Sequence, residues 1–176
     1  MAAPFGNVDA VVIAQNGDLI SFRRTKYYKK YKHWAVYIGD RNTIGVSSPE
    51  NKWSTIEKKD VSELCSTPPC QGHCCRVNNL EEVARRKRLE TYPNDIIVQR
   101  ALEHYKELFK YSLRFRNCEH FATSCRYSES FSTQVEKYLP SNTKRLQSDN
   151  EVVETVSRRA ERRAFQFAST ENPILS

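Results

Sequence analysis

The sequence contains no long apolar run. Nowhere in its 176 residues do apolar side chains approach the roughly 20 consecutive positions that a helix needs to span a bilayer. The first residues, MAAPFGNVDAVVIAQNGDLI, have no basic n-region and only short apolar stretches, so the pattern of a secretory signal is missing as well. These absences predict a cytoplasmic protein without a transmembrane segment.

The signatures of nucleic-acid binding are also missing. The sequence has no zinc-finger spacing, no aromatic RNA-binding signature and no helix-turn-helix pattern. Its net charge of +7 still favours anionic partners. We therefore expect reversible association with an anionic membrane surface and no contact with nucleic acid, while nothing in the sequence indicates an oligomeric state.

Composition divides the chain after Pro140. Residues 1–140 combine apolar and charged positions as a folded domain does, whereas residues 141–176 form a polar linker and a basic tail. Within the tail, EVVETVSRRAERRAFQF (residues 151–167) predicts a short amphipathic helix. The side chains that would face a membrane surface are Val152, Val153, Val156 and Phe165.

Hydrophobic patterning in residues 1–140 predicts an α+β fold, with strands first and helices after them. The expected extended segments are two strands around a turn at 16–18 within 9–22, a basic connection over 23–32, a hairpin of strands 33–38 and 43–47, and a strand in 52–61. The expected helical segments are a turn or short helix in 78–90, a helix over 94–109 capped by Asn94 or Asp95, one beginning near Asn117, and one over 131–139.

The stretch RFRNCEHFATSCRY (residues 114–127) sets Cys118 directly after a candidate cap residue, Asn117. A thiol in the first helical turn lies among unsatisfied N–H groups at the positive end of the helix dipole, which favours the thiolate. Cys118 also shares a helical stripe with Phe121, Ala122 and Cys125, at spacings i, i+3, i+4 and i+7. The residue is therefore either a nucleophile or one more small residue of the core.

A thiol nucleophile needs a base, and His33 is the histidine best placed to be one. It opens HWAVYIGD, a strand in which one face consists of Trp34, Val36 and Ile38 and the other of His33, Ala35, Tyr37 and Gly39. The second face is small and polar, which suits a groove. A helix-start cysteine packed against a sheet that presents a histidine is the arrangement that thiol acyl transfer requires.

Four blocks of sequence, NGDLISF, HWAVYIGD, CRVNN and NCEHFATSCRY, occur in the order seen in the lecithin:retinol acyltransferase-like superfamily. The chain resembles most closely the phospholipase A/acyltransferase branch, over about residues 15–138. The resemblance implies a circularly permuted papain-like fold, with an antiparallel sheet packed against the nucleophile helix. It also implies that an acyl chain is removed from a glycerophospholipid through a cysteine thioester, without a cofactor, and passes to water, lysophospholipid or the amine of phosphatidylethanolamine.

The same resemblance assigns roles to individual residues. Cys118 corresponds to the nucleophile, His33 to the general base, and Tyr31 to a tyrosine that helps to hold the oxyanion. Asn117 and Glu119 match the flank of the cysteine motif and receive no catalytic role.

Three features depart from the family pattern. Family members carry a second polar residue, most often histidine, twelve positions after the base, and this chain has Gly45 there. Alternation along TIGVSS places Thr43 and Ser47 on the face of Gly45, as substitutes for the residue that orients the imidazole. The segment TKYYKK is longer than its family counterpart, and the chain ends in RRAERRAFQFASTENPILS instead of a hydrophobic anchor.

Three alternatives remain open. Gly45 favours a non-catalytic binding or regulatory protein of the same fold, and a papain-like peptidase is a further reading, against which the NCEHF block argues. A zinc site is the third, since the stretch CSTPPCQGHCC (residues 65–75) holds Cys65, Cys70, His73, Cys74 and Cys75. Their spacing matches no common zinc motif and favours a loop with free thiols.

Overall fold

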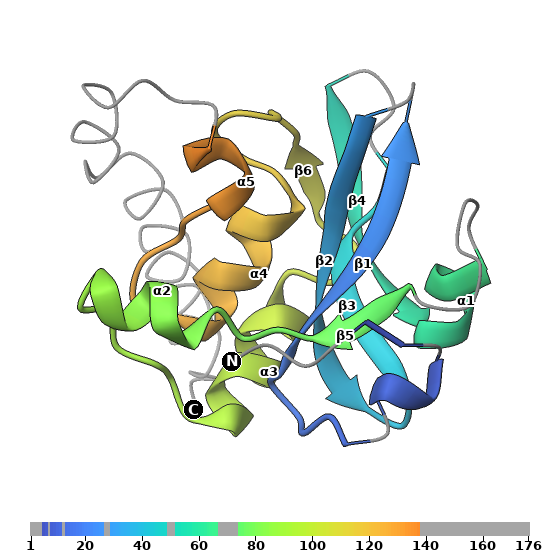
Figure 1. The fold of residues 1–176 in the computed structure, drawn as a ribbon, viewed down its shortest axis with the longest axis horizontal. Helices are drawn as coiled ribbons and strands as arrows, with labels where there is room; N and C mark the ends of the chain where they lie inside the picture. The colour runs from blue at the N-terminus through green and yellow to red at the C-terminus, as the bar shows by residue number, and fades with distance from the viewer. Residues whose placement is uncertain are drawn as a thin grey trace, which may run out of the picture. The chain divides into compact units, whose positions relative to one another are not determined.

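In the computed structural model, residues 5–6, 8–11, 13–26, 29–48, 52–66 and 74–137 are described. They form one sheet of antiparallel strands in the order β5-β1-β2-β3-β4-β6 (Figure 1). The strands are β1 (Leu19–Lys26), β2 (Lys29–Gly39), β3 (Asn42–Val46), β4 (Trp53–Asp60), β5 (Cys75–Val77) and β6 (Leu108–Lys110). The helices are the 3-10 helix η1 (Val8–Val11), α1 (Val61–Ser66), α2 (Glu81–Arg86), α3 (Asn94–Glu103), α4 (Cys118–Arg126) and α5 (Thr133–Glu136). The predicted α+β class is confirmed.

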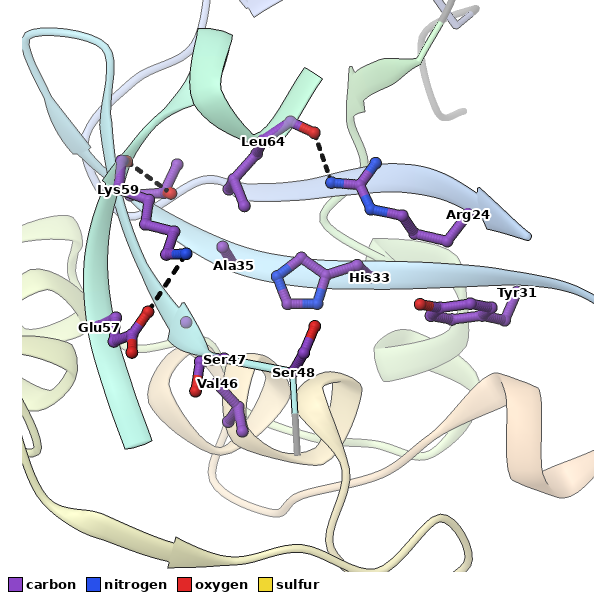
Figure 2. A pocket seen from close by; sticks show the side chains of 12 residues that line it. Arg24, Tyr31, His33, Ala35, Val46, Ser47, Ser48, Glu57, Lys59 and Leu64 are labelled. Carbon is purple, nitrogen blue, oxygen red and sulfur yellow. Dashed lines mark hydrogen bonds and ion pairs between the residues drawn. The ribbon is translucent and has the colours of Figure 1, made fainter. Parts of the chain in front are cut away.

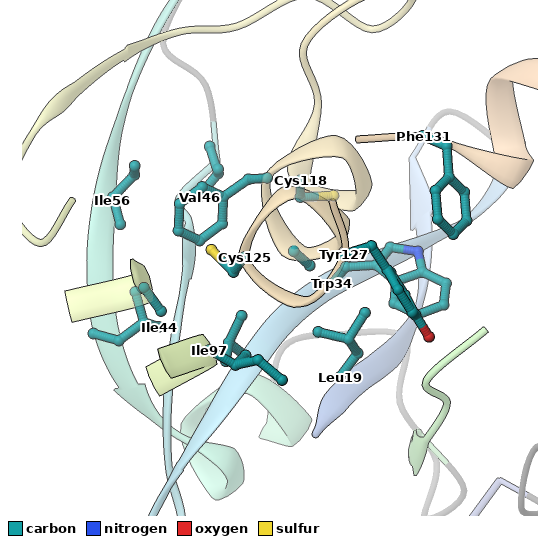
Figure 3. Packing of buried hydrophobic residues seen from close by; sticks show 14 of the residues in the cluster. Leu19, Trp34, Ile44, Val46, Ile56, Ile97, Cys118, Cys125, Tyr127 and Phe131 are labelled. Atoms are coloured by element: carbon teal, nitrogen blue, oxygen red, sulfur yellow. The ribbon is translucent and has the colours of Figure 1, made fainter. Parts of the chain in front are cut away.

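Helices cover both faces of the sheet, and alternation along the strands gives each face its own core. The helices α2 to α5 lie on one side and α1 on the other (Figure 1). The larger core joins α3 and α4 to the sheet through residues that include Leu19, Trp34, Val36, Ile44, Ile97 and Phe121 (Figure 3). The smaller core joins η1 and α1 to the opposite face through Val11, Ile20, Phe22, Ala35 and Leu64. As predicted, Trp34 and Ala35 therefore face opposite ways.

The hairpin of β2 and β3 forms close to where the sequence predicts it. Its turn residues Asp40 and Arg41 both have positive φ, at 47° and 62°. A two-residue turn of this kind matches the right-handed twist of the flanking strands. Gly39, with a φ of 95°, supplies the left-handed backbone that leads into the turn.

Three local predictions were wrong. The segment expected to form the first strand contains η1, and β1 begins only at Leu19. The expected connection over 23–32 belongs largely to β1 and β2, which pair from Leu19↔Val36 to Lys26↔Lys29. Cross-strand pairing there outweighs the basic composition of the segment. Neither Asn94 nor Asp95 caps α3, because its N-cap is Pro93, and the helix ends at Glu103.

Other predictions fall partly or wholly outside the described residues. The tail helix over 151–167 lies outside them, as do residues 67–73 of the cysteine-rich segment, whose flanking Cys65, Cys74 and Cys75 are buried. In the part of the chain that the structure describes, no set of three or more His, Cys, Asp or Glu side chains is arranged to hold a metal ion. No helix among the described residues has the length and apolar character needed to cross a bilayer.

Candidate active site

The start of α4 is held by Asn117, as predicted. The side-chain oxygen of Asn117 accepts hydrogen bonds from the backbone N–H groups of Glu119 and His120, at 2.9 and 3.1 Å. Its amide nitrogen donates to the carbonyl oxygen of Leu113 at 2.9 Å. Because the cap ties the preceding turn to the helix start, the position of the next residue, Cys118, is well defined.

Cys118 reaches the edge of β2 beside His33. Its side chain is only 5% exposed, and the thiol donates to the carbonyl oxygen of Lys32 at 3.8 Å. The backbone N–H of Trp34 also bonds to the sulfur. Pairing between β2 and β3 extends toward this end only as far as Ala35 and Gly45, so β3 leaves this stretch of the β2 edge open. The sulfur therefore contacts the backbone on both sides of His33.

The same edge of β2 is held by the side chain of Gln134. The backbone N–H of Lys32 donates to Gln134 Oε1 at 2.6 Å, and Gln134 Nε2 donates to the Lys32 carbonyl oxygen at 3.0 Å. Gln134 Nε2 also lies 3.1 Å from Oε2 of Glu119, a fully buried carboxylate. The other donors to that carboxylate are the hydroxyls of Ser132 and Thr133 and the backbone N–H of Gln134. Sequence reasoning missed Gln134, because its contact with Lys32 spans 102 positions.

Burial governs the protonation of the thiol. It raises the pKa of Cys118 to about 12, with the Trp34 N–H opposing the rise and the Glu119 carboxylate adding to it. Burial likewise raises the pKa of Cys125, further along α4, to about 12. The expected stabilisation of a thiolate by the helix N-terminus is outweighed here, because the sulfur is removed from water.

His33 lies on the face of β2 opposite to the larger core, and it lines a small pocket of about 90 Å³ (Figure 2). Its ring lies 6.0 Å from the ring of Phe22, centroid to centroid. Burial, with the cations of Arg24 and Lys59 contributing, lowers the pKa of His33 to about 3. The imidazole is therefore neutral at physiological pH.

The pocket brings together the predicted base, His33, and the residues that the sequence places around it: Tyr31, Thr43, Gly45 and Ser47. No hydrogen bond joins the imidazole to any residue that the structure describes. The two predicted substitutes are engaged elsewhere, since Thr43 donates to the carbonyl oxygen of Lys59 at 3.1 Å and Ser47 Oγ accepts from the Thr55 N–H at 3.1 Å. The hydroxyl of Ser48 points toward the ring (Figure 2). Sequence reasoning missed Ser48, because β3 ends at Val46 and alternation stops there.

Close packing of Ala35 and Trp34 against Gly45 leaves little space for a side chain at position 45. A Cβ atom at this position would lie 2.9 Å from Cβ of Ala35 and 3.2 Å from the carbonyl oxygen of Trp34. Its φ lies outside the left-handed region, so the restriction is one of space. Ala35 and Gly45 are cross-strand partners, and both line the pocket together with His33.

Thiol and imidazole approach the same stretch of β2 without a hydrogen bond between them. Tyr31, which is 41% exposed, lies near both groups. Burial raises the pKa of Tyr31, Arg24 opposes the rise, and Cys118 adds to it. Burial also raises the pKa of Tyr111, with Cys118 and then Tyr31 contributing, so Tyr111 is a second phenol close to the thiol that sequence reasoning missed. Contacts between catalytic groups are often long in ligand-free enzymes and tighten when substrate binds.

Comparison with known proteins identifies the family. Residues 13–131 match the family model described as lecithin retinol acyltransferase. The chain is 35% identical over 130 residues to human phospholipase A and acyltransferase 4, an alignment that covers 69% of this chain and 74% of that protein. It is 34% identical over 129 residues to human phospholipase A and acyltransferase 2, covering 68% and 74%. It is 42% identical over 143 residues to mouse lecithin retinol acyltransferase, covering 69% and 58%. The chain thus belongs to the lecithin:retinol acyltransferase-like superfamily, in its phospholipase A/acyltransferase branch.

Proposed function

We propose that this chain is a thiol-dependent phospholipase A and acyltransferase that acts on glycerophospholipids. The observation that carries the proposal is the position of Cys118, at the capped start of α4 with its sulfur on the β2 edge beside His33. Relatives named for phospholipase A and acyltransferase activity support the substrate class. We further infer that the sheet and α4 form a circularly permuted papain-like fold within residues 1–140.

In the proposed reaction, His33 takes the proton of the Cys118 thiol as the sulfur attacks the ester carbonyl. A C–S bond forms, the ester C–O bond breaks, and His33 gives the proton to the oxygen of the leaving lysophospholipid. Tyr31 supports the oxyanion. The acyl chain then leaves the thioester for water, a lysophospholipid hydroxyl or the amine of phosphatidylethanolamine.

The protonation states of Cys118 and His33 before substrate binds determine when the proton moves. The pKa of Cys118 is raised to about 12 and that of His33 is lowered to about 3, so both groups are neutral before substrate arrives. Proton transfer is therefore coupled to attack on the bound ester. An incoming ester that brings the imidazole into hydrogen-bonding contact with the thiol would start the reaction.

The membrane supplies the substrate. We propose that the protein is cytoplasmic and associates reversibly with anionic membranes, with residues 141–176 as a basic tail that contributes to binding. The pocket of about 90 Å³ is far smaller than the roughly 300–1,000 Å³ of sites that enclose a whole small ligand, so the acyl chains stay outside it.

Intact-protein mass spectrometry after exposure to phosphatidylcholine vesicles tests the proposal. We expect a mass gain of one acyl chain on the wild type, located to Cys118 by peptide mapping, and no gain on Cys118→Ser. An acyl adduct on Cys125, or the same adduct on Cys118→Ser, would exclude Cys118 as the nucleophile.

A second function, a non-catalytic binding or regulatory protein of the same fold, is favoured by one group of observations. Gly45 provides no side chain to orient His33, and the imidazole has no hydrogen-bonding partner among the described residues. A wild-type protein that binds phosphatidylcholine vesicles and forms no acyl-enzyme at any pH between 6 and 9 would make this the better function.

A further inference from the structure

Exposed apolar and basic side chains gather just before the turn into α4. Trp53, at the start of β4, is 53% exposed and pairs with Lys110 of β6, so the two side chains lie on the same face of the sheet. The short turn that follows, residues 112–116, exposes Leu113 by 78% and Phe115 by 55%. We call this set the docking surface, and it consists of Trp53, Leu108, Lys110, Leu113, Arg114 and Phe115.

Contacts within the chain hold this surface in place. The N–H of Tyr111 donates to the carbonyl oxygen of Lys52 at 2.8 Å, which fixes the end of β6 against the start of β4. Ser112 and Arg116 exchange two backbone hydrogen bonds of 2.9 Å and close the turn. Figure 1 shows β6 beside β4, with the segment that follows β6 leading to α4. The exposed side chains are thus presented by a built turn.

The chemistry of the surface matches an anionic lipid bilayer. Residues 108–117, LFKYSLRFRN, contain three basic residues and no acidic one. The guanidinium of Arg114 lies 5.1 Å from the centre of the Phe115 ring, so an apolar group and a cation point to the same region. Aromatic and aliphatic side chains next to basic ones are typical of segments that insert into the headgroup layer. A binding partner for this surface must carry negative charges next to apolar groups. The headgroups and acyl chains of an anionic membrane provide both.

We propose that the docking surface inserts into the headgroup layer of an anionic glycerophospholipid membrane and sets the start of α4 against it. The turn ends at Asn117, whose amide bonds to the Leu113 carbonyl oxygen, and Cys118 is the next residue. Insertion there brings lipid ester groups to the thiol while the acyl chains remain in the bilayer. This consequence rests on the proposed function, but the binding itself does not.

Tryptophan fluorescence of the full chain tests the surface directly, because the two tryptophans differ in exposure. Trp34 is fully buried, whereas Trp53 is 53% exposed. Vesicles of phosphatidylcholine and phosphatidylserine at 7:3 should shift the emission to the blue, and brominated phosphatidylcholine in them should quench it. Trp53→Phe should lose both responses. Full binding to these vesicles without any change in Trp53 emission would overturn the proposal and assign binding to the tail.

Paired variants separate the apolar from the electrostatic contribution. Leu113→Ser/Phe115→Ser should weaken vesicle binding by about tenfold or more, since both side chains leave the headgroup layer. Lys110→Gln and Arg114→Gln should each weaken it by about fivefold at low salt and much less at high salt. The matched control is Ile13→Ser, which is 75% exposed just before β1. In this antiparallel sheet β1 begins at the end opposite to the start of β4.

The outcomes also separate this proposal from the proposed function. Loss of binding in the double variant but not in Ile13→Ser supports the docking surface, whether or not an acyl-enzyme forms. Wild-type binding by the double variant, or no binding of the wild type to anionic vesicles, would overturn it and leave a protein partner as the occupant. If the surface is correct and the proposed function is not, vesicles still shift Trp53 emission while Cys118 gains no acyl group.

Discussion

The two sides of β2 differ in how fully their polar groups are bonded. On the α4 side, Asn117, Glu119 and Gln134 form a continuous set of hydrogen bonds that ends on the backbone of Lys32. On the pocket side, His33 has a neutral ring without a hydrogen-bonding partner among the described residues, and Gly45, which also lines the pocket, offers no side chain to bond it. The helix start that carries the thiol is therefore held by several hydrogen bonds, whereas none from the described residues fixes the imidazole. We infer that stability depends mainly on the first side, and catalytic rate on both.

The sharpest test of this comparison replaces one thiol at a time. Cys118→Ser should lower phospholipid hydrolysis by about 10³-fold or more, because an unactivated hydroxyl is a far weaker nucleophile. Cys125→Ser is the matched control, since Cys125 lies on the same helix, is 2% exposed and has its pKa raised to about 12 as well. Release of free fatty acid measures both. Equal losses in the two variants would mean that the position of Cys118 on the β2 edge has no special role.

Removing the buried charge of Glu119 tests the α4 side of β2. Glu119→Gln should lower the free energy of unfolding by about 2–4 kcal/mol, because an amide turns donors toward the hydroxyls and N–H groups that the carboxylate now accepts from. The control is Glu103→Gln, where an exposed carboxylate accepts from Gln99 at 3.0 Å, and a change within about 0.5 kcal/mol is expected. Urea unfolding measures both. A similar small change in both variants would contradict the view that the Glu119 network stabilises the fold.

Acid should lower the stability of the fold because two buried histidines resist protonation. The folded-state pKa values of His33 and His120 are lowered to about 3 and about 4, mainly by burial, while an unfolded histidine titrates near 6.5. The unfolded chain therefore binds more protons below pH 6.5, and stability present above that pH is lost as the pH falls through about 4 for His120 and about 3 for His33. We expect a loss of about 1–2 kcal/mol from His33 between pH 7 and 5. Thermal melts of the wild type and of His33→Gln across this range measure it, and parallel pH profiles would show that His33 is not buried in its neutral form.

Adding a side chain at Gly45 tests the pocket side of β2, where His33 lies. The single change Gly45→His should destabilise the protein by about 1–3 kcal/mol, because its Cβ would lie 2.9 Å from that of Ala35. The double change Ala35→Gly/Gly45→His removes the 2.9 Å contact and leaves the 3.2 Å contact with the carbonyl oxygen of Trp34, and the new imidazole can then orient His33. Turnover of the double variant should exceed that of Ala35→Gly severalfold. A folded double variant without any gain would indicate that orientation of His33 does not limit the rate.

Local patterns predicted those parts of the molecule that local physics determines. The β2–β3 hairpin follows from alternation and turn residues, and α4 from the Asn117 cap and its apolar stripe. Contacts between distant segments were not predictable in the same way. The hydrogen bonds of Gln134 to Lys32 and the contact that Ala35 would make with a side chain at 45 depend on how the strands and α5 come together. The charged segment 23–32 was misjudged for the same reason, since pairing between β1 and β2 makes it extended.

The glutamine that closes the β2 edge has a consequence for how the chain is made. Translation delivers β1 to β4 well before Gln134, so the backbone N–H and C=O of Lys32 are exposed to solvent on a nascent hairpin. An open strand edge of this kind can pair with another nascent chain. Lys30 and Lys32, which lie along this stretch, carry positive charges that discourage such pairing until residue 134 leaves the ribosome. Chains truncated between β4 and α5 should therefore depend on chaperones, while the complete domain protects this edge with one side chain.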